Sequence, residues 1–234
     1  MATEKRVMNK ISFVIPCFNN EENIDDLFNA LFENEKQFHE VCFEYVMIDD
    51  ASKDKTIEVL KKWQGNSTYQ IKVVELNKNI GSHKAVFKGL NYVTGDCVII
   101  MAADLQDPPE LSYKMFMEWK KGGKLVLAIK NNPMPAFSKL FHNIMRILFV
   151  RRAPKGAFDY VLFDKSLIPK LQIKSIRNCN LFYRLIDLQS ETSILNYTKE
   201  KRLKGKSGWT FQKKIVFFSE NLLYYSISKT GITK

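Results

Sequence analysis

Short apolar runs alternate along the chain with longer segments in which apolar residues recur every three or four positions. Residues 11–16 (ISFVIP), 43–48 (FEYVMI) and 97–102 (CVIIMA) are short runs rich in apolar and β-branched residues, and they predict buried strands. Residues 22–38 and 55–63 have the apolar spacing of amphipathic helices. This alternation of strands and helices with short connections predicts a mostly parallel sheet with right-handed crossovers.

Polar residues gather at the ends of these predicted strands and of a further strand over residues 71–76. The segments that follow the four strands include CFNNEEN, DDASKD, NKNIG and ADLQD. In an open α/β sheet the carboxyl ends of parallel strands meet at one edge, which is where ligands bind. None of the turns carries the glycine pattern of a dinucleotide-binding fold or a P-loop, which argues against a dehydrogenase and a P-loop NTPase. The competing interpretation of residues 103–107 is an acidic loop that only solvates a strand end.

Composition limits the classes of protein and partner. The 234 residues, of which 45% are hydrophobic, suffice for one large α/β domain or for a domain with an appendage. A formal net charge of +11 favours an anionic partner, such as a nucleotide-bearing substrate, nucleic acid or an acidic membrane surface. The four cysteines lack metal-binding spacing and predict reduced thiols in the cytoplasm. No apolar run approaches the roughly 18 residues of a spanning helix, so we expect any membrane contact to be peripheral.

Six segments carry a resemblance to a known family. In chain order they are ISFVIPCFNNEENI, VMIDDASKDKT, ELNKNIGSHKAVFKGL, GDCVIIMAADLQDPPEL, FDYVLFDKSLI and RLKGKSGWT. Together they resemble family 2 glycosyltransferases of the GT-A fold, in particular the branch of dolichyl-phosphate mannose synthases and bacterial polyprenyl-phosphate glucosyltransferases. The resemblance implies an α/β GT-A fold with a mostly parallel central sheet flanked by helices. It further implies a catalytic domain over residues 1–210 and an amphipathic helical appendage over residues 211–234.

The resemblance also implies a reaction. Members of the family transfer a sugar from a nucleotide-diphosphate donor to an acceptor, with inversion at the anomeric carbon. We therefore expect a nucleotide-sugar donor, specifically a UDP-sugar, and a saccharide or lipid-linked acceptor of cell-surface polysaccharide or glycolipid synthesis. Such chemistry needs residues that bind the nucleobase, groups that neutralise the charge of the diphosphate leaving group, and a general base that faces the anomeric carbon.

Donor contacts follow from the same resemblance. Pro16, Asn19 and Glu21 are expected to line the nucleoside pocket, and Asp49 or Asp50 to hydrogen-bond the base. A helix N-cap is the structural alternative for the DDASKD segment. The remaining expected donor contacts are Lys84, Gln106, Lys130 and, in a basic lid that resembles the R-x-x-G-K-S loop of the family, Arg202, Lys206 and Ser207. A solvated basic run is the alternative for that lid.

A divalent cation is expected at the end of the strand over residues 97–102. The mannose synthase pattern has Asp-Ala-Asp there, whereas this chain has Ala102, Ala103 and Asp104, so one carboxylate is missing. Mg²⁺ or Mn²⁺ can still be held by one protein carboxylate, diphosphate oxygens and waters. Asp104 is therefore the expected metal ligand, with Gln106 and Asp107 as candidates for the second shell or the donor sugar. An enzyme that works without metal is the alternative.

The general base of the family lies in a later strand motif that contains aspartate. Here the corresponding segment is GAFDYVLFDKSLI, which makes Asp159 the expected general base. Asp164 lies five residues further on, just before a segment with helical spacing, where an N-cap explains it better.

Two amphipathic segments have two possible roles, so the sequence does not decide how the acceptor reaches the protein. Residues 138–152 (SKLFHNIMRILFVRR) and 211–225 have apolar stripes beside basic residues, which suits either a membrane interface or packing in the core. We expect a cytoplasmic protein, with association to the inner face of the plasma membrane as the open alternative. Two rival classes remain: a catalytically inactive module that binds sugar nucleotides, favoured by the missing carboxylate, and an RNA-binding protein, for which no nucleic-acid motif is present.

Overall fold

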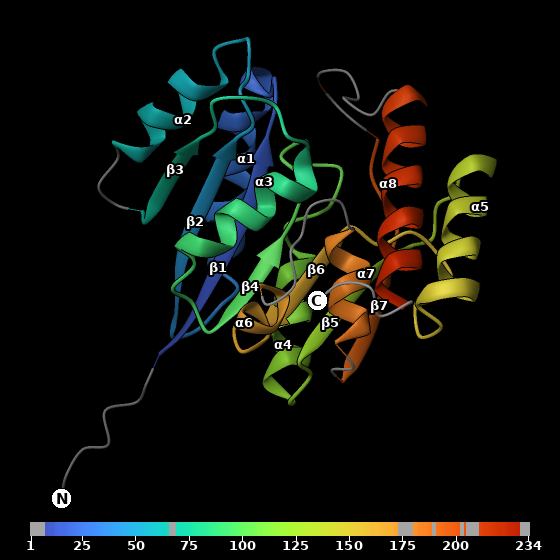
Figure 1. Cartoon of the computed structure of the whole chain (residues 1–234). Helices are drawn as coiled ribbons and strands as arrows, with labels where there is room; N and C mark the ends of the chain where they lie inside the picture. Colours follow the sequence, from blue (N-terminus) through green and yellow to red (C-terminus); the bar gives the residue numbers. More distant parts are fainter. Residues whose placement is uncertain are drawn as a thin grey trace, which may run out of the picture.

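The computed structural model describes residues 8–65, 69–172, 180–188, 191–201, 204 and 211–229 (Figure 1). The elements in chain order are β1 (Asn9–Cys17), α1 (Glu21–Glu35), β2 (Val41–Asp49), α2 (Thr56–Gln64), β3 (Ile71–Glu75), α3 (Ser82–Gly89), β4 (Cys97–Ile100), α4 (Leu111–Lys120), β5 (Leu125–Lys130), α5 (Ala136–Ile144), β6 (Tyr160–Asp164), α6 (Leu167–Gln172), α7 (Leu181–Asp187), β7 (Thr192–Tyr197) and α8 (Phe211–Lys229). A 3₁₀ turn, Leu90–Tyr92, follows α3, and a π-helical turn, Met145–Phe149, follows α5.

The described residues form a seven-stranded sheet in the order β3-β2-β1-β4-β6-β5-β7. β1 pairs in parallel with β2 and β4, and β7 pairs in parallel with β5. β6 is antiparallel to both of its neighbours, β4 and β5. The expectation of an α/β fold with a mostly parallel sheet flanked by helices is confirmed.

The reversed direction of β6 decides which residues meet. Because β6 runs against β4 and β5, its amino end lies at the same edge as the carboxyl ends of its neighbours. Tyr160, the first residue of β6, pairs with Ala128 near the end of β5, and Lys130 pairs with Tyr197 at the end of β7. Asp159, Lys130 and the residues after Tyr197 therefore converge at this carboxyl edge of the sheet.

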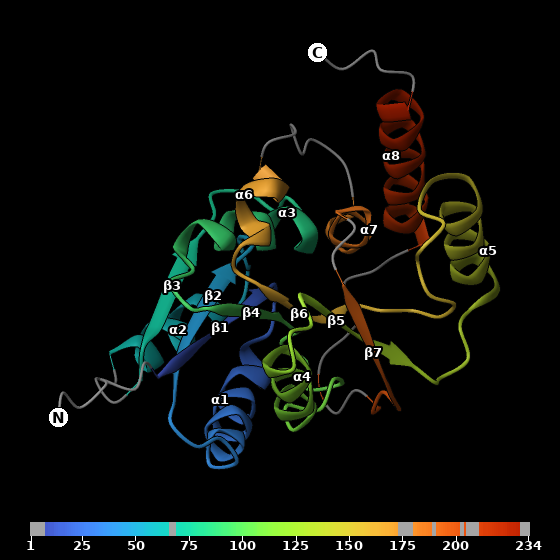
Figure 2. The same cartoon turned by 90° about the horizontal axis from the view of Figure 1, so that it is seen from below.

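Helices cover both faces of the sheet, with α1 and α4 on one side and α3 and α6 on the other (Figure 2). Two buried clusters correspond to these faces, one with Leu27 of α1 and Met115 of α4, the other with Val86 of α3 and Leu167 of α6. The second cluster also includes Tyr225 of α8. In both views α8 and α5 lie side by side (Figures 1 and 2). Among the described residues, no helix has the length and apolar character needed to cross a bilayer.

The amino edge of the sheet is held by a buried carboxylate. Glu44 of β2 accepts hydrogen bonds from the Ser12 hydroxyl, from the Thr94 hydroxyl at 2.5 Å and from the Thr94 N–H at 2.6 Å, and it lies 2.9 Å from Lys10 Nζ. Gly95 has to be glycine here, because a Cβ would lie 2.5 Å from Ser12 Oγ. Burial alone would raise the pKa of Glu44, but its hydrogen bonds outweigh burial and lower the pKa to about 2.

Replacement of Glu44 by glutamine tests this contact. Glu44→Gln should lower the free energy of unfolding at neutral pH by about 1.5–3 kcal/mol, because hydrogen bonds to a charged acceptor are lost. The folded pKa lies below the usual 4.5, so this stabilisation is present above pH 4.5 and is lost as the pH falls toward about 2. The difference in the free energy of unfolding between the two proteins, measured with urea, should therefore disappear as the pH falls across this interval. Glu33→Gln, in an exposed pair with Lys36, is the control and should change little; a difference independent of pH would contradict the assignment.

Candidate functional site

A cavity of about 280 Å³ opens at the carboxyl edge of the sheet. Its walls come from the loops after β1, β2 and β4, from the start of α3, and from Asp159 and Phe182. The lining residues are Pro16, Cys17, Phe18, Asn20, Asp50, Ser82, His83, Val86, Ile100, Met101, Ala102, Ala103, Asp104, Asp159 and Phe182. Four of the residues expected to bind donor or metal or to catalyse transfer, from four different segments, thus share one cavity: Pro16, Asp50, Asp104 and Asp159.

Asn19 and Glu21 hold two loops together and are absent from the cavity wall. Asn19 has a positive φ of 52°. Its side-chain oxygen accepts a hydrogen bond from the Lys53 N–H at 2.8 Å, and Glu21 accepts one from the Lys55 N–H at 2.8 Å. Both side chains therefore connect the loop after β1 to the loop after β2. Their direct contact with a donor stays a prediction.

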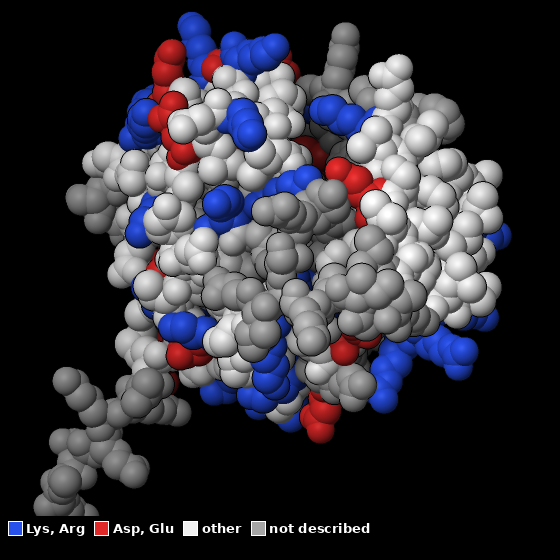
Figure 3. Space-filling view, in the orientation of Figure 1, with Lys and Arg blue, Asp and Glu red and all other residues white. Residues whose placement is uncertain are grey.

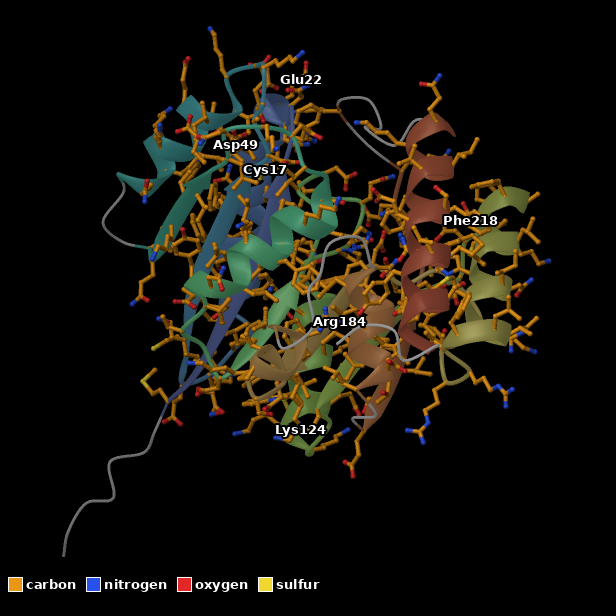
Figure 4. The ribbon with its side chains drawn as sticks, in the orientation of Figure 1. Cys17, Glu22, Asp49, Lys124, Arg184 and Phe218 are labelled. Carbon is orange, nitrogen blue, oxygen red and sulfur yellow. The ribbon has the colours of Figure 1, made fainter. Side chains whose placement is uncertain are left out.

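The two neighbouring aspartates after β2 have different surroundings. Asp50 lines the cavity and accepts hydrogen bonds from the N–H groups of Ile80 and Gly81, at 2.8 and 2.9 Å. Burial raises the pKa of Asp50 above its ordinary value, and these two N–H groups oppose that rise. Asp49 accepts from the Ser52 N–H at 3.2 Å, and its other oxygen is buried with no hydrogen-bond partner among the described residues. Figure 4 shows Asp49 close to Cys17, at the ends of the paired strands β2 and β1.

A second groove, of about 860 Å³, lies between α8 and the NKNIG turn before α3. Asp50 lines this groove too, together with Lys84 and Lys213. Lys84 Nζ is 3.9 Å from the Glu220 carboxylate, which connects α3 to α8. Lys213 Nζ lies 5.5 Å from the centre of the Phe18 ring. The groove thus extends the cavity along α8, and its wall contains the basic side chains of Lys84 and Lys213.

Asp104, the expected metal ligand, is one of the carboxylates in the cavity wall. It is buried, lines the cavity, and accepts a hydrogen bond from the Gln106 N–H at 3.2 Å. Gln106 itself joins its loop to Glu200 through two hydrogen bonds, one of them 2.9 Å long between the Glu200 N–H and the Gln106 carbonyl. No group of three or more potential metal ligands occurs within the described ranges. Asp104, a buried carboxylate in the cavity wall, fits an ion that takes one protein carboxylate and completes its shell with donor oxygens and water.

Beside the cavity lies a cluster of four charges, Asp107, Lys130, Asp159 and Lys199, here called the edge charge cluster. Lys130 Nζ is 2.5 Å from Asp159 Oδ2, and Lys199 Nζ is 3.8 Å from the same oxygen and 3.3 Å from Asp107 Oδ1. Asp107 is fully buried and accepts a hydrogen bond of 2.5 Å from the Tyr197 hydroxyl. The four side chains come from the loop after β4, the end of β5, the residue before β6 and the segment after β7.

The cluster shifts the pKa values of its two carboxyl groups in opposite directions. Burial would raise the pKa of Asp159, but the positive charges of Lys130 and Lys199 outweigh it and lower that pKa. Burial, together with the negative charge of Asp159, raises the pKa of Asp107. Of the two carboxyl groups, Asp159 is therefore the one whose ionised form the cluster favours.

An aromatic cavity of about 220 Å³ adjoins Asp159 on the side of α5 and α8. Its wall includes His142 and Phe141 of α5 and Phe217 of α8, and the His83 ring stacks on Phe217 with centroids 4.8 Å apart. Burial lowers the pKa of both histidines to about 4. The cavity therefore presents neutral rings at neutral pH, directly beside the charged Asp159.

Sequence reasoning missed Lys199, Tyr197 and the aromatic cavity. Tyr197 ends β7, whose residues are partly exposed and carry no strong apolar pattern. Asp164, the last residue of β6, accepts hydrogen bonds from Trp119 Nε1 at 2.9 Å and from the Ser166 N–H at 3.1 Å, and it pairs with Cys97 at the edge of the sheet opposite the cavity. Arg202, Lys206 and Ser207, the expected lid, lie outside the described residues, as does Cys179.

The chain is similar in sequence and in fold to known glycosyltransferases. An uncharacterised glycosyltransferase of Synechocystis is 27% identical over 225 residues, covering 93% of this chain and 70% of that protein. A bactoprenol glucosyl transferase of Shigella phage SfX is 27% identical over 210 residues, covering 86% of this chain and 68% of that protein. A glucosyl-3-phosphoglycerate synthase of Mycobacterium tuberculosis, solved with Mn²⁺, uridine diphosphate and phosphoglyceric acid, superposes with a TM-score of 0.67 at 15% identity, over 95% of this chain and 79% of that chain. This last likeness shows that the fold is shared with a GT-A glycosyltransferase.

The model of the family described as "Glycosyl transferase family 2" matches residues 12–168, and this match establishes the family. That match runs from Ser12 within β1 to Ile168 within α6 and includes Asp50, Asp104 and Asp159, which meet at the cavity. The chain belongs to glycosyl transferase family 2 and is a glycosyltransferase.

Proposed function

We propose that the chain transfers a sugar, with inversion, from a UDP-sugar to a polyprenyl-linked acceptor. The observation that carries this proposal is the meeting of Asp50, Asp104 and Asp159 in one cavity at the carboxyl edge. The name of the phage relative, bactoprenol glucosyl transferase, supports the acceptor class. The uridine diphosphate in the mycobacterial synthase supports the donor class.

In the proposed site each carboxylate has a different task. Asp50 and the groove along α8 would receive the nucleoside, with Pro16 and Phe18 as the adjoining wall. A divalent cation held by Asp104 would neutralise charge on the diphosphate leaving group. Asp159 lines the same cavity and is ionised at neutral pH, which is the protonation state that a general base needs.

The acceptor side combines positive charge with an apolar wall. Lys130 and Lys199 lie beside Asp159, and the aromatic cavity adjoins the same carboxylate. A polyprenyl-linked phosphate has matching chemistry, because its anion suits lysine ammonium groups and its chain suits aromatic rings. This pairing supports a lipid-linked acceptor over a purely polar sugar.

One other function deserves a test, because only one carboxylate of the Asp-Ala-Asp pattern is present, at Asp104. A catalytically inactive module would bind the sugar nucleotide without turnover. The deciding experiment incubates the protein with a panel of labelled sugar nucleotides, Mn²⁺, and either polyprenyl phosphate or a lipid-linked saccharide. Labelled lipid product supports the proposed function, and donor binding without product from any pair supports the inactive module.

Replacement of Asp159 by asparagine tests its role as the base. The amide keeps the size of the side chain but removes the proton acceptor, so Asp159→Asn should lower kcat for a hydroxyl acceptor by about 10² to 10⁴ and leave donor affinity nearly unchanged. With a phosphate as the acceptor, which is largely ionised at neutral pH, the variant should lose less of its kcat. Asp164→Asn is the matched control, because Asp164 contacts Trp119 and Ser166 instead of the cavity. Transfer by Asp159→Asn within about threefold of wild type would remove Asp159 from the base role.

The edge charge cluster predicts coupled effects on stability. Lys199→Met leaves Asp107 buried beside Asp159 without its cation, and it should lower the free energy of unfolding by about 3–5 kcal/mol. Adding Asp107→Asn should restore part of this loss, because no buried charge is then left without a partner. Urea unfolding of the two single variants and the double variant measures the coupling. Lys201→Met, at an exposed position, is the control; additive effects of Lys199→Met and Asp107→Asn would contradict the pairing.

A further inference from the structure

Residues 131–158, which join β5 to Asp159, have an unusual charge pattern. This segment contains no aspartate or glutamate and five basic residues, namely Lys139, Arg146, Arg151, Arg152 and Lys155. Elsewhere the chain mixes both signs, with 36 basic and 25 acidic residues in total. The segment therefore carries an uncompensated positive charge of its own.

The helical part of this segment has two apolar faces. Phe141, on the inner face of α5, is buried and packs against Phe218 of α8, with ring centroids 5.4 Å apart. Figure 4 shows Phe218 on the α5 side of α8. Three aliphatic side chains are exposed instead, here called the aliphatic ridge: Leu140 at 57%, Ile147 at 60% and Leu148 at 52%. Core packing of α5 accounts for the first face and leaves the ridge unexplained.

Basic residues border the aliphatic ridge. Lys139 precedes Leu140, and the exposed Arg151 and Arg152 follow Leu148 by three and four positions. Figure 3 shows the side of the molecule that holds α5 as mostly uncharged, with basic side chains at its lower margin. Aliphatic side chains flanked by arginine and lysine are the composition of segments that lie in the interface of an anionic membrane.

We propose that the aliphatic ridge and its flanking basic residues dock the protein on an anionic lipid membrane. The basic charge and the apolar side chains of this surface together select the occupant. A second copy of this chain would place the same basic residues against themselves in a two-fold contact, which like charges disfavour. A nucleic acid would match Arg151 and Arg152 but would gain nothing from Ile147 and Leu148. Lipid headgroups and acyl chains together match both features.

The docking surface also bears on the proposed function, and this part rests on the lipid-linked acceptor. Ser138, Phe141 and His142 of α5 line the aromatic cavity beside Asp159. One helix therefore carries the cavity wall on its inner face and the exposed Leu140 away from it. An α-helix is roughly 10–12 Å across, so docking would bring the membrane within about one helix diameter of the cavity. A polyprenyl acceptor could then present its head group without leaving the bilayer.

Vesicle co-sedimentation tests the surface with the full chain. Wild-type protein should sediment with vesicles of phosphatidylcholine and phosphatidylglycerol and much less with phosphatidylcholine alone. Ile147→Asp places a charge on the aliphatic ridge and should abolish sedimentation with anionic vesicles. Met117→Asp, at an exposed position on α4, is the matched control and should leave it unchanged.

The basic flank is tested separately. Arg151→Ala and Arg152→Ala should each weaken binding to anionic vesicles roughly fivefold, since each basic residue near an anionic surface contributes by about that factor. Lys114→Ala and Lys120→Ala, exposed on α4, are the controls. Binding of Ile147→Asp equal to wild type overturns the proposal, and if binding is lost only in the arginine variants the surface is a polyanion site. Circular dichroism confirms that each variant is folded.

Two transfer assays separate this inference from the proposed function. With a short, water-soluble polyprenyl acceptor, Ile147→Asp should match wild type, whereas with acceptor embedded in anionic vesicles it should lose activity. Vesicle binding by wild type without transfer to any acceptor would refute the proposed function and leave the surface standing. Transfer in solution by a wild-type protein that does not bind anionic vesicles would refute the surface and leave the function standing.

Discussion

The direction of β6 is the constraint on which the whole site depends. Because β6 runs against both of its neighbours, Asp159, which directly precedes it, lies beside Lys130 at the end of β5. A strand of five residues is roughly 16 Å long, so a parallel β6 would carry Asp159 to the opposite edge of the sheet. The cavity, the edge charge cluster and the aromatic cavity all include or adjoin this one residue.

The edge charge cluster explains how the site is held in place before any ligand binds. Buried carboxylates are stable only with partners, and Asp107 has Lys199 at 3.3 Å and the Tyr197 hydroxyl at 2.5 Å. These contacts tie the segment after β7 to the loop that carries Asp104. Lys130 and Lys199 in turn keep Asp159 ionised. Charges fixed in this way need little rearrangement during a reaction, which is the condition for electrostatic catalysis.

Local patterns in the sequence predicted the parts of the fold that depend on local structure. The apolar runs over residues 11–16 and 43–48 lie within β1 and β2, and the polar segments after them meet at the predicted edge. The cluster depends on pairing between distant strands, which no local pattern reveals. Tyr197 and Lys199 follow a strand with partly exposed residues, so neither stood out. Likewise, the hydrogen bond from Lys53 to Asn19 arises from the approach of two loops, which periodicity cannot show.

The central claim is that the carboxyl edge binds a nucleoside diphosphate together with a cation held by Asp104. Calorimetric titration of UDP, with and without Mn²⁺, into wild type and Asp104→Ala measures it most directly. Asp96→Ala is the control, because Asp96 accepts a hydrogen bond from the Lys10 N–H at the opposite edge of the sheet. The account predicts that Mn²⁺ raises UDP affinity roughly 5- to 150-fold in wild type and Asp96→Ala, and not in Asp104→Ala. An equal gain in all three proteins, or no UDP binding by wild type, would contradict it.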